Sequence, residues 1–125
     1  MNAWFLSAGI TAAAVAVIHA VAGGRDVARP LSASDLADEP RRTLHAVWHM
    51  VTADLTLAAA ALIWLSPGNR PGGDTIAWLL AAHFVAYSAV FLTVTLRANW
   101  SRPLVRLPQW LLLLPVAVLA AVGTA

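Results

Sequence analysis

Four long apolar segments constrain this chain more than any other feature of its sequence. They cover residues 3–22, 43–65, 75–96 and 107–125. A helix needs about 20 mostly apolar residues to cross a bilayer, so each segment is long enough for one crossing, the last one marginally. With 60% hydrophobic and 11% charged residues, the chain also has too little polar surface to coat a soluble domain. The sequence therefore predicts one all-α integral membrane domain over residues 1–125, a four-transmembrane-helix up-down bundle.

Local signals suggest where these helices begin, end and approach one another. The first segment has the position of a secretory signal, but no basic residue precedes it and its apolar run is too long, so we expect a retained span. Gly23-Gly24 is expected to end the first helix, and Pro40 to lie in the first turn of the second. Small residues at four-residue spacing predict close helix packing along the first span, at Ala8, Ala12, Ala16 and Ala20.

The arginines predict how the chain is oriented in the membrane. Seven of the eight basic residues lie in the first and third loops: Arg25, Arg29, Arg41, Arg42, Arg97, Arg102 and Arg106. The positive-inside rule places these loops in the cytoplasm and both termini outside, and we expect the arginines to face anionic lipid head groups. No motif for nucleic-acid binding accompanies them. The alanine- and arginine-rich, lysine-free composition suggests a bacterial protein, so we expect the inner membrane.

All four histidines lie inside the apolar segments, where an ionisable side chain is costly and is usually functional. His45 and His49 are four residues apart and share one helix face, which Thr52 and Thr56 continue. We expect this polar stripe to face protein. At 1.5 Å per residue, His19, His49 and His45 lie ~10 Å, ~7 Å and ~13 Å from the middle of their spans, all on the cytoplasmic side.

A cofactor site is the first functional hypothesis for these histidines. Three imidazoles can bind zinc or copper with one position open, and histidines on facing helices can hold haem b. The chain has no cysteine, which excludes thiolate ligands and covalent haem attachment. Electron transfer or metal handling would follow, using His19, His45 and His49, with His83 as a further candidate ligand. Alternatively, the protein is a non-catalytic subunit whose polar residues only specify helix packing.

Asp54 is the second anomaly, because a carboxylate near the centre of a span costs roughly 2.5–3.5 kcal/mol on insertion scales. It lies about 180° around the helix from His45, so it does not extend the histidine stripe. His83 lies ~4 Å to the outer side of the middle of its span, near Asp54 in depth, with Tyr87 one turn further. Asp54 is therefore expected to pair with His83, to contact another subunit, or to carry protons or cations.

The third functional hypothesis, a small proton- or ion-coupled transporter built on Asp54, requires a homo-oligomer or a larger membrane complex, because four helices enclose little pathway. The sequence predicts no enzymatic reaction. The chain has no phosphate-binding glycine loop, and the segment from His45 to His49 lacks the glutamate of the metalloprotease motif. Catalytic residues are therefore not assigned.

Overall fold

The structure is a computed structural model that describes residues 1–68 and 70–125, and in these residues it contains helices and no strands. Its first half is a hairpin of two long helical segments. The first arm is continuous and the second arm is a single helix, with these bounds: α1 (Ala3–Ile18), the π-helical segment η1 (His19–Ala28), α2 (Arg29–Ser32) and α3 (Asp38–Leu65). The two arms pack along their length, chiefly through α1 and α3.

The second half is a shorter hairpin. Its bounds are α4 (Gly73–Arg97), the single turn α5 (Pro103–Arg106) and α6 (Gln109–Val122). In α6, Pro115 lies inside the helix, which continues through it to Val122. The helix α4 packs against α6, and the fully buried Phe84 and Val116 come from these two helices. Both residues belong to a core to which all four long helices contribute.

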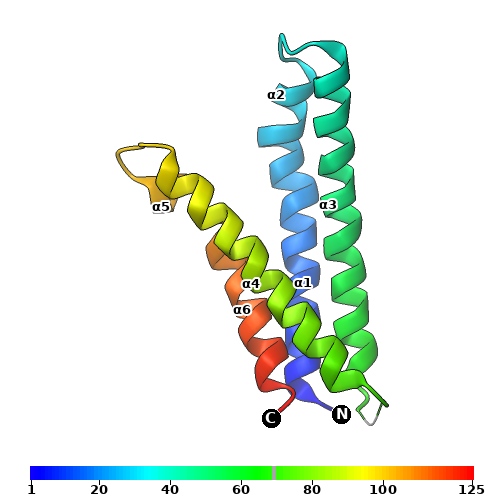
Figure 1. Cartoon of the computed structure of the whole chain (residues 1–125). Helices are drawn as coiled ribbons and strands as arrows, with labels where there is room; N and C mark the ends of the chain where they lie inside the picture. The colour runs from blue at the N-terminus through cyan, green and yellow to red at the C-terminus, as the bar shows by residue number, and fades with distance from the viewer. Residues whose placement is uncertain (69) are drawn as a thin grey trace.

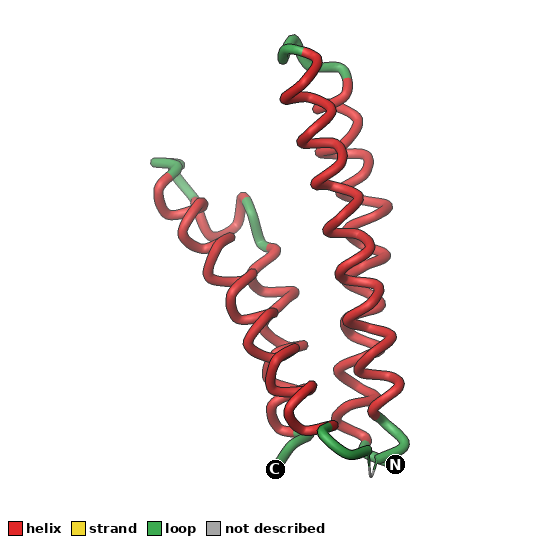
Figure 2. Tube along the Cα trace, turned by 45° about the vertical axis from the view of Figure 1, so that its right-hand side comes forward, coloured by secondary structure: helices red, strands yellow, loops and turns green. Residues whose placement is uncertain are grey.

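The two hairpins form an open V rather than a closed bundle. They meet at the end that holds both termini and the loop between α3 and α4, and they diverge toward the other end (Figures 1 and 2). The main contact between the hairpins is made by α1 and α6, whereas α3 and α4 touch only slightly. The structure supports a helical membrane bundle, and the up-down four-helix topology stays a prediction. Part of the surface of α3 and α4 is left without a helical neighbour.

Within the residues that the structure describes, three helices are long and apolar enough to cross a membrane, which supports a multi-pass membrane protein. They are Ala3–Ser32 with 30 residues, Asp38–Leu65 with 28 and Gly73–Arg97 with 25. The helix α6 has only 14 residues. At 1.5 Å per residue it is about 21 Å long, shorter than a hydrocarbon core of about 30 Å. The fourth crossing stays a prediction.

The first helix does not end where its glycines suggested. Helical structure continues through Gly23 and Gly24 to Ser32, so the expected end at these residues is wrong. Gly23 has a different role, which is to allow the close approach of α3. A Cβ at this position would overlap the ring of Trp48 on that helix. Glycine serves here to admit a neighbour and not to form a left-handed cap. Pro40 lies in the first turn of α3, as predicted.

The small-residue strip of the first span is confirmed over three of its four positions. Ala8 and Ala12 are completely buried and Ala16 is 8% exposed, while Ala20 is exposed. The strip belongs to the core shared with α3 and α6. Small side chains let helix backbones approach closely where apolar burial alone gives no driving force. The contact between the first arm and α3 is weaker along η1 than along α1.

Candidate functional site

Asp54 and His83 join the two hairpins through their side chains. The Nε2 atom of His83 lies 3.0 Å from Oδ2 of Asp54, within hydrogen-bonding distance. Asp54 comes from α3 and His83 from α4, two helices that otherwise have few contacts. The structure thus brings together one of the pairings that the sequence left open. An intramembrane carboxylate needs such a partner or a proton.

The pair lies about ten residues from the closed end of the V on both helices. Leu65 ends α3 eleven residues after Asp54, and Gly73 begins α4 ten residues before His83. At 1.5 Å per residue the pair is therefore about 15 Å from that end. The two hairpins diverge from that end toward the other (Figure 2). The polar contact links them within the first half of α4.

A hollow of about 360 Å³ adjoins the pair on the side of the closed end. It is lined by Asp54, Leu57, Ala58, Ala61, Leu79, Leu80 and His83. Among these residues the only polar side chains are those of the pair itself. The side chain of His83 is 30% exposed and that of Asp54 is 38% exposed, so both reach the surface of the hollow. The pair is therefore not enclosed by the core of the single chain.

Aromatic rings hold the imidazole of His83 in place. The ring of Tyr87, one helical turn further along α4, lies 4.2 Å from it between centroids. Phe84 meets it edge to face at 5.5 Å. Phe84 is completely buried, so this wall of the site is rigid. The ring position is therefore set by the core of the second hairpin.

His19 is engaged between the two arms of the first hairpin. It is the first residue of η1, and its ring stacks on Trp48 of α3 with centroids 3.8 Å apart and planes 17° apart. Its Nε2 atom lies 3.4 Å from the carbonyl oxygen of Trp48. Both contacts use the face that α1 and α3 share. The location of His19 is thus explained by packing.

His45 and His49 are adjacent but lie on the surface. Their rings are 4.7 Å apart between centroids in an edge-to-face arrangement, and both residues are exposed. Thr52 and Thr56 donate their hydroxyl hydrogen bonds to carbonyl oxygens of their own helix, at 3.1 Å and 2.8 Å. The expectation that this stripe faces protein is wrong for the single chain, because its histidines and Thr56 are exposed.

The structure does not gather His19, His45 and His49 into a common site. In residues 1–68 and 70–125 there is no group of three or more histidine, aspartate or glutamate side chains that could hold a metal ion. Depth placed His19, His45 and His49 in one layer, but depth leaves open which way each side chain faces. His19 meets Trp48, while His45 and His49 form a separate pair. The metal and haem hypotheses stay predictions.

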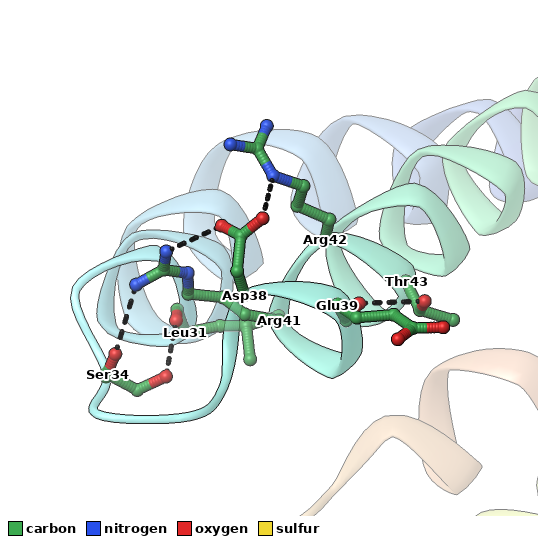
Figure 3. Close-up of polar contacts among 7 residues, drawn as sticks. All are labelled: Leu31, Ser34, Asp38, Glu39, Arg41, Arg42 and Thr43. Carbon is green, nitrogen blue, oxygen red and sulfur yellow. Dashed lines mark hydrogen bonds and ion pairs between the residues drawn. The ribbon is translucent and has the colours of Figure 1, made fainter.

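The two arginine-rich loops lie at the same, splayed end of the molecule, but their charge differs (Figure 1). In the first loop Arg25 pairs with Asp26 at 2.7 Å. The guanidinium groups of Arg42 and Arg41 bind Asp38 at 2.7 Å and 3.0 Å (Figure 3). Hydrogen bonds from Arg42 and Arg41 lower the pKa of the Asp38 carboxyl. Positive charge there is largely balanced by neighbouring acids.

The other loop carries three arginines, Arg97, Arg102 and Arg106, and no acidic residue. Arg106 lies over the ring of Trp100, 5.2 Å from its centroid. Val105 beside it is 75% exposed. Exposed apolar and aromatic residues among arginines are typical of a segment at the lipid head groups. The positive charge of these three arginines is not offset by any acidic residue in their own loop.

Sequence reasoning missed the stack of His19 on Trp48, a contact between η1 and α3. It also missed the pairing of Arg41 and Arg42 with Asp38 within α3, which their spacing of three and four residues could have indicated. The near match in depth between His83 and Asp54 was the one signal of the pair. Comparison of the chain with models of protein families, with curated proteins and with solved structures found no match.

Proposed function

We propose that this protein is a small membrane protein that exchanges protons through Asp54 and His83, as part of proton-coupled transport. The observation that carries the proposal is the 3.0 Å contact between the carboxylate and the imidazole beside an open hollow. Ionisable groups inside membranes are rare and usually mark proton or ion paths. A histidine is suited to this role because imidazole gains and loses protons near neutral pH.

The direction of access follows from the side on which the hollow lies. The hollow extends from the pair along residues that precede the end of α3 and follow the start of α4. We place this end, with both termini, on the outside of a bacterial inner membrane, because the arginine-rich loops lie at the other end. A fourth crossing requires α6 together with its adjoining residues. Protons then reach Asp54 from outside.

The test is whether Asp54 changes its protonation state. Infrared difference spectra of the protein in lipid detect the carboxyl and carboxylate bands, and loss of a band in Asp54→Asn assigns it to this residue. We expect a change of pH to exchange the carboxyl band of Asp54 for its carboxylate band, and His83→Gln to alter that exchange, because the imidazole is the hydrogen-bonding partner of the carboxyl group. An Asp54 that stays protonated throughout, with or without His83, would identify a packing role instead.

A metal or haem site is a second candidate, favoured by the open pair of His45 and His49 with rings 4.7 Å apart. The two imidazoles can bind one zinc or copper ion, with further ligands from His19 or from another chain. They cannot be the two opposite axial ligands of one haem, since they lie on the same face of one helix. Haem b would need His19 or His83 opposite them.

This second candidate predicts a retained ligand that depends on both histidines. Protein purified gently from membranes should contain zinc or copper by elemental analysis, or show a haem absorption band. Either His45→Ala or His49→Ala alone should remove most of the bound metal or haem, because the coordinating side chains act as a unit. Protein without metal or haem absorption would reject this candidate and leave proton exchange by Asp54 unaffected.

A further inference from the structure

We infer that a second copy of the chain covers the α3–α4 face, defined by Asp54, Leu57, Ala61, Leu79 and His83, and completes the site. Leu57 is 70% exposed and Leu79 is 67% exposed, so apolar side chains surround the polar pair on this face. The side chains of the pair are about one-third exposed as well. A polar pair within an apolar face is unlike a surface made only for lipid.

The depth of the pair is what makes lipid an unsuitable cover. Asp54 lies at the centre of residues 43–65, so its exposed oxygen would face hydrocarbon. Acyl chains offer neither hydrogen-bond donors nor charges, and charged side chains in membranes almost always face protein or water. The open V leaves this face without any further helix of the same chain, because α1 and α6 pack behind it. Another protein surface is required.

The face is complementary to itself, which favours a copy of this chain over a different partner. It carries one carboxylate and one imidazole, so the acid of one copy can meet the imidazole of the other across a two-fold axis. Two copies inserted in the same orientation are related by an axis along the membrane normal. Residues at the same depth in the two copies therefore face each other across this axis. Ala61 leaves room for close approach, as small residues do in membrane helix contacts.

Cysteine crosslinking tests this dimer cleanly, because the chain contains no cysteine of its own. We expect Leu57→Cys and Ala61→Cys to give disulfide-linked dimers under mild oxidation in membranes, since residues near the axis meet their own counterparts. Val118→Cys on α6 is the matched control. It lies near the centre of residues 107–125, as Leu57 does in its span, and is 58% exposed.

Crosslinks at Leu57→Cys or Ala61→Cys that exceed those at Val118→Cys, and that persist when the protein is diluted in added lipid, are the expected result. Absence of crosslinks at both positions, equal crosslinking at the control, or a product containing a different protein would overturn the inference. Crosslinking does not depend on proton transfer. A dimer without protonation changes at Asp54 would therefore reject the proposed function alone, and the reverse result would reject only the dimer.

Discussion

Gly9→Ala is expected to destabilise the first hairpin by about 1–3 kcal/mol, the usual cost of overpacking. A Cβ at this position would lie 2.6 Å from Cγ1 of Ile63, 2.9 Å from the backbone nitrogen of Ile63 and 3.2 Å from the carbonyl oxygen of Ala59. Two of these atoms are backbone of α3, so no rotation of a side chain relieves the overlap. The helices α1 and α3 must move apart, and the buried alanine strip moves with them.

Gly24→Ala supplies the matched control for this prediction. It lies in the same continuous helical arm, and a Cβ there would meet nothing within 4 Å. Alanine is favoured over glycine in a helix by up to about 1 kcal/mol, and the added methyl group meets no neighbour here, so this variant should be neutral or slightly stabilised. Unfolding of both variants by denaturing detergent gives the comparison. Equal stability of Gly9→Ala and the unmodified protein would show that α1 and α3 do not pack as described.

Local patterns in the sequence predicted the helical class and part of the packing. Apolar segments of about 20 residues indicate helices that are stable in a lipid bilayer. They can be recognised in the sequence without knowledge of the tertiary structure. The alanines at 8, 12 and 16 share a helix face by their spacing alone, and the structure buries them against α3 and α6. Pro40 was placed correctly because proline is favoured in the first turn of a helix.

Relations between helices were beyond these patterns. Depth along a span is calculated from residue number, but the direction of a side chain depends on which neighbours the helix finds. For this reason the three histidines at one depth do not form a common site. His19 faces α3, whereas His45 and His49 face outward. The π-helical geometry from His19 onward also changes the angular spacing of residues from the α-helical value. The two hairpins also splay apart, so that α3 and α4 have little contact. The pattern of a single helix does not indicate how two hairpins are oriented relative to each other.

Asp54→Asn is expected to reduce proton flux to the rate of protein-free vesicles. Asparagine has nearly the shape of aspartate and can still hydrogen-bond Nε2 of His83, so the contact that is now 3.0 Å long can persist. It cannot bind or release a proton. Loss of flux with retained folding would therefore report on proton exchange and not on the link between the hairpins.

The control is Asp74→Asn, which removes a carboxylate from the start of the helix that carries His83. Asp74 lies in the first turn of α4, is exposed, and lies nine residues before His83. Its negative charge stabilises the N-terminal end of the helix. Its loss should therefore lower the stability of the protein by only a few tenths of a kcal/mol and leave the proton flux unchanged. His45→Gln serves the same purpose for the histidines, because His45 is exposed and distant in sequence from the pair.

Proton flux into vesicles of phosphatidylcholine and phosphatidylglycerol, followed with an internal pH-sensitive dye under an imposed potassium diffusion potential, is the most direct measurement. If Asp54 and His83 form the working site, the unmodified protein, Asp74→Asn and His45→Gln should carry protons well above the rate of empty vesicles. Asp54→Asn should not, and His83→Gln should be strongly impaired. Flux in Asp54→Asn equal to that of the unmodified protein, or no flux above empty vesicles in any of them, would contradict a proton-exchanging pair at this site.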